Sequence, residues 1–488
     1  MHRLIDRTPF DRDDDRFHDE CGVFGVFRNS DAAALTALGL HALQHRGQEA
    51  AGIVAADRGA FRTERHRGLV SDNFTNKDVM DRLVGDAAIG HCRYATQGEP
   101  AIHNVQPLFA ETAMGGFAVA HNGNFTNAHV LRAMLRDRGS IFQSTSDTEV
   151  LIHLFATSQK TSFIERFIDA IRQVEGAFAL VGLTDGIMLG CRDALGIRPL
   201  VIGDYEGAFI LASETCALDI IGARYVRDVE PGELVILSDQ GIRSVRPFPP
   251  TAERFCVFEY VYFARPDSIV GGRNVYDVRK RIGRELAMES PVPADVVVPV
   301  PDSGTPAAIG FAEGAGLPFD LGIIRNHYVG RTFIEPTDQI RRLGVKLKHN
   351  ANRQSLAGKR VILVDDSIVR GTTSLKIVEM VREAGAAEVH MRIASPPTKD
   401  SCFYGVDTPE KSKLIASRMS VEDLARYIRV DSLAFLSMDG LYRAAGEERR
   451  DPDAPRYCDA CFSGDYPTPL TDRSEANAKH SLPQLENV

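Results

Sequence analysis

Two adjacent carboxylates, Asp365 and Asp366, are the residues of this 488-residue chain best placed to do chemistry. They follow an apolar run inside the sequence VILVDDSIVRGTT at 361–373. Such a run is typical of a buried strand, and open α/β sheets bind ligands beyond the carboxyl ends of their strands. The two carboxylates fit the paired hydroxyls of a ribose, or a Mg²⁺ ion that bridges them. An isolated Asp-Asp pair would equally suit an acidic turn that caps a helix.

The residues after these carboxylates predict a site for a phosphate group. Gly371 allows the backbone to turn tightly, and Thr372 and Thr373 open the next helix with hydroxyl and N–H groups. The amino end of a helix suits an anion because its N–H groups and its dipole face the ligand. Ser367 and Arg370 stand in the same loop. A Walker loop is excluded, because it needs a Gly-Lys-Ser/Thr sequence.

A second strand and loop, VVVPVPDSGT at 296–305, follows the same pattern. Its loop offers the carboxylate of Asp302, the hydroxyl of Ser303 and the flexible backbone of Gly304. A plain Pro/Gly turn is the alternative interpretation. Between the two loops runs the basic segment RTFIEPTDQIRRLGVKLK at 331–348. This segment is either a solvated loop or one that closes over a substrate and excludes water.

Cys21 is a candidate nucleophile at the start of the β-like run CGVFGVF. An ordinary buried cysteine in a strand is the alternative. Four further strings favour the nucleophile: QHRGQE at 44–49, HCRYAT at 91–96, HNGN at 121–124 and SDTE at 146–149. Together they resemble the N-terminal-nucleophile glutaminase domain of the purine-type amidotransferases, over residues 21–250.

This resemblance implies roles for particular residues. A leader, 1–20, would be removed so that the α-amino group of Cys21 becomes the general base, which an amine pKa near ~8 permits at neutral pH. Arg93 would bind the α-carboxylate of glutamine, and Asp147 would bind its α-ammonium. The Asn122 side-chain amide and the Gly123 N–H would be the oxyanion donors. Arg46 would be a site-supporting residue. Each oxyanion donor is commonly worth ~3 kcal/mol of activation barrier.

The string at 361–373 resembles the phosphoribosyl-pyrophosphate motif of type I phosphoribosyltransferases. With the glutaminase half, the resemblance extends over nearly the whole chain to the amidophosphoribosyltransferase family. It implies that phosphoribosyl pyrophosphate is bound by Asp302, Ser303, Gly304, Asp365, Asp366, Ser367, Arg370, Gly371, Thr372 and Thr373. It also implies one Mg²⁺ ion at Ser303, Asp365 and Asp366.

Two cysteines near the end of the chain, in the sequence CDAC at 458–461, are spaced so that both thiolates can reach one metal. Alone, the pair could be redox-active or half of a zinc site. The resemblance is to the iron–sulfur branch of the family, and it implies a structural 4Fe–4S cluster on Cys256, Cys402, Cys458 and Cys461. Zinc held by four thiolates is the alternative. Cys191 and Cys216 have no partner pattern and are expected in the core.

The distribution of apolar residues differs between the two halves of the chain and predicts which strands and helices carry these residues. From 21 to about 250, short apolar runs between Gly, Asn and Asp turns predict sheets. Beyond the proline-rich PFPPT at 247–251, continuous apolar strands alternate with helices, which is typical of a parallel sheet covered on both faces. Helices are predicted near 31–44, 127–138, 147–157, 161–174, 274–289, 304–315 and 372–385.

The predicted fold is therefore an α+β N-terminal-nucleophile domain, an αββα sandwich, followed by an α/β type I phosphoribosyltransferase domain. The predicted organisation is a leader, a glutaminase domain, a phosphoribosyltransferase domain and a tail that carries the Cys-x-x-Cys pair, at 1–20, 21–250, 251–450 and 451–488. A length of 488 residues agrees with two such cores.

Composition narrows the class further. A net charge of −9 argues against nucleic acid as the main partner. No run approaches the ~18 apolar residues that span a bilayer, so no membrane partner is expected. The first twenty residues lack an apolar h-region, and eight cysteines in so long a chain are no disulfide framework. The cytoplasm is the expected compartment.

The resemblance finally implies a reaction and an assembly. Ammonia released from glutamine would displace pyrophosphate from phosphoribosyl pyrophosphate to give 5-phosphoribosylamine, the entry to purine synthesis. The family is often a homotetramer inhibited by purine nucleotides. Two rival functions are a hexosamine-forming amidotransferase and a non-catalytic nucleotide-binding relative of the phosphoribosyltransferases. The intact string at 361–373 argues against both.

Overall fold

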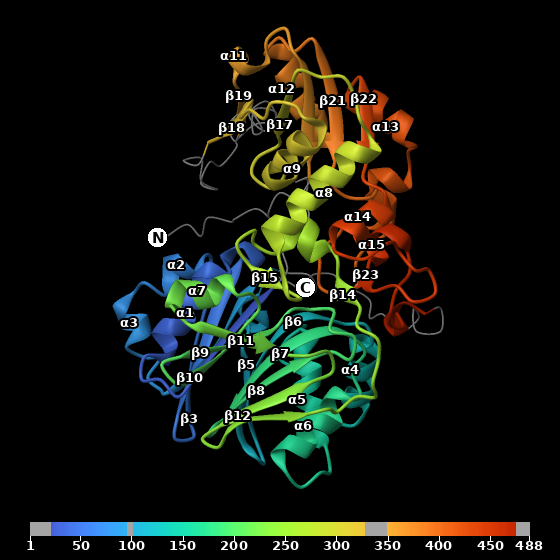
Figure 1. The fold of residues 1–488 in the computed structure, drawn as a ribbon. Helices are drawn as coiled ribbons and strands as arrows, with labels where there is room; N and C mark the ends of the chain where they lie inside the picture. Colours follow the sequence, from blue (N-terminus) through green and yellow to red (C-terminus); the bar gives the residue numbers. More distant parts are fainter. Residues whose placement is uncertain (1–20, 95–100, 327–348, 475–488) are drawn as a thin grey trace, which may run out of the picture. The chain divides into compact units, whose positions relative to one another are not determined.

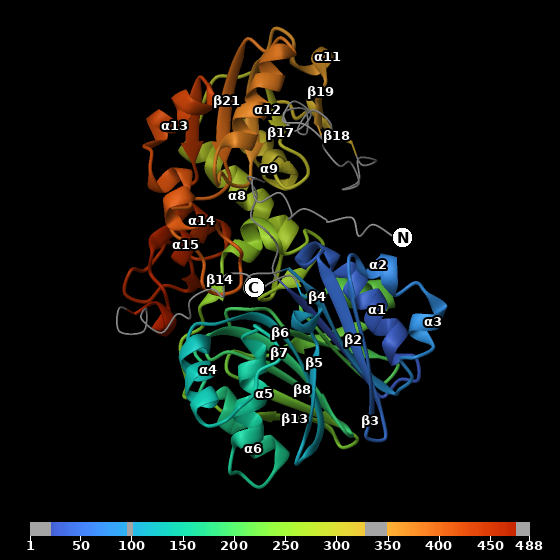
Figure 2. The ribbon, with the colours of Figure 1, turned by 180° about the vertical axis from the view of Figure 1, so that it is seen from behind.

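The computed structural model describes residues 21–94, 101–326 and 349–474 (Figures 1 and 2). The leader 1–20 and the basic segment 331–348 lie outside the described residues, as does the end of the HCRYAT string. The chain divides into two compact units. Among the described residues, one unit comprises those within 21–278, 401–408 and 450–474, and the other comprises those within 279–400 and 409–449.

Two antiparallel sheets form the centre of the first unit. The first has seven strands in the order β11 (Arg224–Asp228), β9 (Val201–Tyr205), β10 (Ala208–Ala212), β1 (Gly22–Phe27), β4 (Ala87–Arg93), β2 (Ala50–Asp57) and β3 (Ala60–Arg67). The second has six strands in the order β13 (Gly241–Val245), β12 (Leu234–Ser238), β8 (Ile187–Arg192), β7 (Gly176–Thr184), β6 (Gly115–Phe125) and β5 (Leu108–Thr112). Buried residues of both sheets, Val23 and Ile89 with Ala120 and Val181 among them, pack into one apolar layer.

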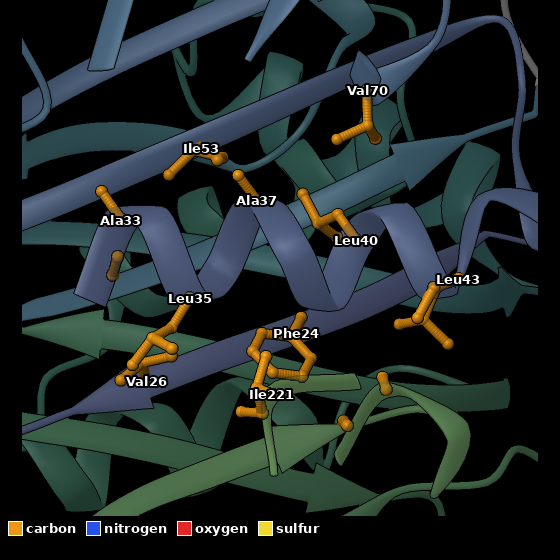
Figure 3. Packing of buried hydrophobic residues seen from close by; sticks show 14 of the residues in the cluster. Phe24, Val26, Ala33, Leu35, Ala37, Leu40, Leu43, Ile53, Val70 and Ile221 are labelled. Carbon is orange, nitrogen blue, oxygen red and sulfur yellow. The ribbon is translucent and has the colours of Figure 1, made fainter. Parts of the chain in front are cut away.

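Helices α1 (Ala32–Ala42) and α7 (Cys216–Ile221) cover the first sheet (Figure 3). In Figure 3, Leu40 of α1 and Phe24 of β1 lie in the same apolar layer, and both are fully buried. Gly39 allows this close approach, because a Cβ there would lie 2.4 Å from the Phe24 ring. Fully burying one such leucine is worth roughly 1.5–3 kcal/mol. Phe24 therefore fixes the helix against the strand that follows Cys21.

Helices α4 (Ala128–Asp137), α5 (Thr148–Thr157) and α6 (Phe163–Ile171) cover the second sheet with their own apolar cluster. A capping box starts α6, where Ser162 and Glu165 satisfy each other's backbone N–H groups. The unit is thus a sandwich of helices, two sheets and helices, which confirms the predicted αββα fold. Its short elements include η1 (Gln44–Arg46), α2 (Val70–Asn73), α3 (Lys77–Met80), η2 (Ile102–Asn104), the π-helix Glu259–Phe263, β15 (Ile269–Val270) and β16 (Arg273–Asn274).

Residues near the end of the chain also belong to this unit. Strand β23 (Tyr457–Cys458) pairs in parallel with β14 (Phe255–Cys256), and α15 (Ala460–Ser463) and η6 (Thr471–Arg473) follow. The Asp472 carboxylate accepts hydrogen bonds from the His129 and Val130 N–H groups, at 2.9 and 3.1 Å. The tail therefore supplies the cap for the amino end of α4.

A parallel sheet forms the second unit, as predicted. Its order is β17 (Val296–Pro299), β20 (Arg360–Asp365), β21 (Glu388–Ile393) and β22 (Ser432–Phe435). The helices of this unit include α9 (Thr305–Ala315), α12 (Thr372–Glu383), α13 (Val421–Ile428) and α14 (Met438–Ala444). Smaller elements are β18 (Ile323–Arg325), β19 (His349–Ala351) and α11 (Arg353–Leu356). Strands β17, β20 and β21 are buried on both faces, which explains their apolar sequence, whereas the edge strand β22 is only partly buried.

The seven predicted helices are all present, with ends that differ by a few residues. Helix α8 (Val275–Glu289) begins in the first unit and continues into the second. Residues 247–251 lie in no helix or strand, which agrees with the interpretation of their prolines as breakers. Within the described residues, no helix is long and apolar enough to cross a membrane.

Candidate active sites and the cysteine group

Cys21 lies at the start of β1, and the pairing of β1 with β4 brings it beside the end of β4. Gly22 is opposite Cys92, so the Cys21 thiol reaches the Tyr94 carbonyl at 3.5 Å. Burial raises the pKa of the Cys21 thiol to about 11, although the positive charge of Arg93 acts in the opposite direction. The thiol is therefore protonated at neutral pH and needs a base before it can attack. Burial lowers the pKa of nearby His91 to about 3, which makes that ring a poor base.

Arg93 and Asp147 supply opposite charges near this thiol. Both act electrostatically on Cys21. The Asp147 carboxylate, just before α5, accepts a hydrogen bond from the Phe125 N–H at 3.0 Å and lies 3.6 Å from His121. Burial opposes its ionisation, but His121 and these hydrogen bonds outweigh burial and lower the pKa of Asp147. A guanidinium and an ionised carboxylate are the pair that an α-amino acid needs for its carboxylate and its ammonium.

Asn122, in β6, has a side-chain amide that is fully buried, and neither its nitrogen nor its oxygen has a hydrogen-bond partner within the described residues. Leaving a buried polar group unsatisfied costs roughly 1–3 kcal/mol, so such a group is a sign of a ligand. Gly123 follows with φ +137°, and a Cβ there would lie 2.0 Å from the Ala177 oxygen. Only glycine therefore fits at position 123, directly after the unsatisfied amide of Asn122.

Arg46 is held in a buried ion-pair network rather than left for a ligand. Its guanidinium donates to Glu214, and to Glu259 at 2.5 Å. These two carboxylates raise the pKa of Arg46 further, against the opposing effect of burial. A Cβ at the next residue, Gly47, would lie 2.6 Å from the Arg93 backbone. The QHRGQE string therefore packs closely against the end of the strand that carries Arg93.

The sequence reasoning did not identify Glu214, Glu259 or Arg198 as site residues. Arg198 is fully buried and bonds to Glu259 at 3.4 Å and to the Tyr404 carbonyl at 2.8 Å. One signal was present, since Glu259 is a lone carboxylate within the apolar run FCVFEYVYF. A buried carboxylate requires a cation or several donors. The sequence gives no sign of which cation that is.

In the second unit, the two predicted phosphate loops meet at the carboxyl ends of β17 and β20. Asp365 and Asp366 are largely buried, 8% and 7% exposed, and Ser367 donates to the Asp366 carboxylate at 2.5 Å. A Cβ at Gly304 would lie 2.4 Å from the Val364 oxygen and 3.2 Å from the Asp365 Cα. Glycine thus lets the second loop approach the carboxylate edge.

The helices that follow the two loops begin at this edge. Gly371 precedes α12 with φ +77°, a left-handed conformation that favours glycine. It has no side chain to cap the helix, so the amino end of α12 suits an anion. Ser303 and Thr305 lie at the start of α9, and the Asp302 carboxylate pairs with Arg325. The structure therefore brings Asp302, Ser303, Gly304, Asp365, Asp366, Ser367, Arg370, Gly371, Thr372 and Thr373 to one edge of one sheet.

Four cysteines of the first unit gather although they are far apart in sequence. Cys256 pairs in register with Cys458, and the charges of Cys256, Cys402 and Cys458 all act on Cys461. The Tyr404 N–H donates to the Cys402 sulfur at 3.3 Å. Burial raises the pKa of Cys256 to about 11. Burial also raises the pKa values of Cys458 and Cys461, so a metal that binds these buried thiols would have to stabilise their thiolates.

No group of three or more His, Cys, Asp or Glu side chains in the described ranges is arranged to hold a single metal ion. Cys191 and Cys216 are buried in apolar clusters, as predicted.

The first unit has the fold of a glutamine amidotransferase, and the second has that of a phosphoribosyltransferase. Residues 91–219 match the family model described as "Glutamine amidotransferase domain", and 269–421 match "Phosphoribosyl transferase domain". The chain is 60% identical to the amidophosphoribosyltransferase of Rhizobium etli, over 97% of each chain. This chain belongs to the amidophosphoribosyltransferase family.

Solved structures agree with this assignment. The chain is similar to a glutamine phosphoribosylpyrophosphate amidotransferase from B. subtilis complexed with ADP and GMP, with a TM-score of 0.88 and 47% identity, over 94% of this chain and 99% of that one. A structure described as the allosteric regulatory enzyme of purine biosynthesis gives a TM-score of 0.89 at 47% identity, over 95% and 99%.

Proposed function

We propose that this enzyme transfers ammonia from glutamine to C1 of phosphoribosyl pyrophosphate. The products are 5-phosphoribosylamine, glutamate and pyrophosphate, and the reaction is the first step of purine synthesis. One observation carries the proposal: a single chain holds both the Cys21–Asn122 site and the Asp365–Asp366 edge. The extent of its identity to named amidophosphoribosyltransferases supports it.

In the glutaminase half, Cys21 attacks the side-chain amide of glutamine. A thiol with a pKa of about 11 supplies little thiolate at neutral pH, so a base must accept its proton. The α-amino group of Cys21, freed by removal of 1–20, is that base. A carbon–sulfur bond forms, ammonia leaves with the transferred proton, and water hydrolyses the thioester to glutamate and the free thiol.

The surrounding residues orient the substrate and stabilise the charge that develops. Arg93 binds the α-carboxylate of glutamine, and Asp147 binds its α-ammonium. The Asn122 amide and the Gly123 N–H donate to the oxygen of the tetrahedral intermediate. The unsatisfied amide of Asn122 supports this role, since binding in the transition state gives it the partner that it otherwise lacks.

In the transferase half, ammonia attacks C1 and pyrophosphate leaves. Asp365 and Asp366 hold the ribose hydroxyls, and the amino end of α12 holds the 5′-phosphate. A Mg²⁺ ion on Ser303, Asp365 and Asp366 would neutralise charge on the pyrophosphate.

A 4Fe–4S cluster on Cys256, Cys402, Cys458 and Cys461 is the proposed resident cofactor. The gathering of these thiols around the β14–β23 pair supports it. The cluster would join the end of the chain to the glutaminase unit and take no part in electron transfer. A zinc site is the alternative.

Regulation is proposed from a similar structure, and assembly is proposed from the family resemblance. Purine nucleotides are the proposed inhibitors, because a similar enzyme is described as complexed with ADP and GMP. We also propose a homotetramer in the cytoplasm that binds no nucleic acid. Sedimentation equilibrium of the native enzyme would distinguish a tetramer from smaller assemblies.

Isotope transfer tests the proposed reaction. Enzyme given glutamine labelled with ¹⁵N in the side-chain amide should form ¹⁵N-phosphoribosylamine and release one pyrophosphate for each product. Release of ammonia with no consumption of phosphoribosyl pyrophosphate would contradict the proposal.

A further inference from the structure

Residues 402–405 pack against the backbone of Gly123, the proposed oxyanion donor. A Cβ at Gly405 would lie 2.9 Å from the Gly123 Cα and 3.1 Å from its carbonyl carbon. On another side, a Cβ at Gly123 would lie 2.0 Å from the Ala177 oxygen. Gly123 is therefore confined between β7 and this short segment, and both contacts require glycine.

A hydrogen bond joins the segment to the next residue of the same strand. The Asn124 amide donates to the Phe403 carbonyl at 3.0 Å, and Asn124 is 6% exposed. Phe403 and Gly405 thus contact two consecutive residues of β6. A shift of the segment would move the backbone that presents the Gly123 N–H.

The segment is itself held by buried polar contacts. Arg198 donates to the Tyr404 carbonyl at 2.8 Å and to Glu259 at 3.4 Å, and Glu259 accepts from Arg46 at 2.5 Å. Tyr404 also donates its N–H to the Cys402 sulfur at 3.3 Å. Separating one group from such a buried network costs free energy, because its partners are left unpaired in the interior. The segment therefore has little freedom to move.

We propose that residues 402–405, clamped by Arg198, form a backing segment that positions Gly123 for the oxyanion of the glutaminase reaction. The inference rests on the proposed assignment of Asn122 and Gly123 as oxyanion donors. Oxyanion donors act only when they are aimed at the oxygen of the intermediate, and losing one costs about 10²–10³ in kcat. Gly405 and Arg198 are therefore positioning residues, although neither touches the substrate.

Gly405→Ala tests the contact, with Gly241→Ala as its matched control. The two glycines have similar positive φ values, +114° and +99°, but a Cβ at Gly241 would meet nothing within 4 Å. Backbone strain is thus common to both variants, and only Gly405→Ala pushes on Gly123. Asn124→Asp is a milder variant that replaces the donor to Phe403 by an acceptor, and it decides the matter if Gly405→Ala does not fold.

The measurement is inactivation of the full-length, processed enzyme by 6-diazo-5-oxo-L-norleucine, a diazoketone analogue of glutamine. The Cys21 sulfur forms a bond to the diazo carbon, dinitrogen leaves, and the thiol proton goes to that carbon. The concentration dependence reports recognition of the amino acid group, and the limiting rate reports attack beside the polarised carbonyl. Ammonia-dependent synthesis, measured in parallel, checks that each variant is folded.

Gly405→Ala and Asn124→Asp should lower the limiting rate, Gly405→Ala by about tenfold or more, since a displaced donor loses part of the 10²–10³ effect of a deleted one. The half-saturating concentration of the diazoketone should stay unchanged in both variants. In Gly241→Ala, both this concentration and the limiting rate should equal the wild-type values. The backing role alone would be overturned if Gly405→Ala and Asn124→Asp were inactivated at the wild-type limiting rate while Asn122→Ala was inactivated slowly. A normal limiting rate in Asn122→Ala would instead refute the oxyanion assignment on which it rests.

Discussion

Cys256 and Cys458 lie directly opposite each other on the parallel strands β14 and β23. Each strand contains only two residues, Phe255–Cys256 and Tyr457–Cys458. Two-residue pairing is too short to hold the end of the chain by itself. Both cysteines are buried, and the proposed metal group that they share would add to the stability of this short pairing.

Cys458→Ser should therefore remove both the metal and the stability that the metal provides. We expect brown wild-type enzyme and a colourless variant, with a lower melting temperature and lower solubility. The measurements are an absorbance scan and an iron assay after anaerobic purification. Cys191→Ser is the control, because Cys191 is buried in an apolar cluster and should cost stability without loss of iron. Wild-type enzyme with a single zinc, or stable without iron, would rule out the cluster.

The N-terminal base requires processing of the chain. Native, active enzyme should begin at Cys21, with Met1 to Glu20 removed, because only a free α-amino group can accept the thiol proton. Intact mass and N-terminal sequencing measure this directly. An active preparation that keeps Met1 would exclude the proposed base.

The raised pKa of Cys21 predicts how the reactivity of its thiol depends on pH in the unprocessed chain. Its thiol ionises near pH 11 in place of the ordinary 9.0, so the thiolate continues to form as pH rises from about 9 to about 11. The rate of alkylation of Cys21 by iodoacetamide should increase over this interval, measured by peptide mass spectrometry. A rate that levels off near pH 9 would show that burial does not suppress the thiolate.

Glu259 should be important for stability, because it accepts from both Arg46 and Arg198 in the interior. Glu259→Ala leaves two buried cations without this partner and is expected to cost roughly 3–5 kcal/mol of unfolding free energy. The control is Glu379→Gln at an exposed pair with Arg429, where about 0–1 kcal/mol is expected. Urea denaturation compares the two variants. Equal losses would mean that the buried network contributes no more than a surface pair.

Local pattern was sufficient to predict the elements and the site loops. Continuous apolar runs identified β17 and β20, and helical periodicity identified α4, α5 and α12 to within a few residues. The strings around Asn122 and Asp365 identified a segment of β6 and the loop after β20, because a segment that presents polar groups to a ligand has its own local chemistry. Their roles in catalysis stay predictions.

Contacts between distant segments were not predictable in the same way. The Arg198–Tyr404 and Asn124–Phe403 hydrogen bonds join residues with no shared periodicity, so neither local sequence points to the other. The same holds for Arg46 and its two carboxylates. Their pairing depends on how the sheets and the tail pack, which a single sequence does not encode in any local pattern.

The central claim is that one chain carries two separable reactions. Cys21→Ala removes only the sulfur that forms the thioester, so glutamine should no longer support phosphoribosylamine formation. Ammonium should still support it, with a rate that rises toward alkaline pH because NH₃ is the nucleophile. Asp366→Ala should abolish synthesis from either nitrogen source and keep part of the glutamine hydrolysis.

Phosphoribosylamine formation by both variants, measured with glutamine and with ammonium chloride, is the most direct test. The account predicts an ammonia-dependent Cys21→Ala enzyme and an Asp366→Ala enzyme that is inactive with both sources. Loss of ammonia-dependent synthesis in folded Cys21→Ala would mean that the cysteine serves the transferase site. Undiminished synthesis by Asp366→Ala would mean that 361–373 is not the substrate loop, and the account would be wrong.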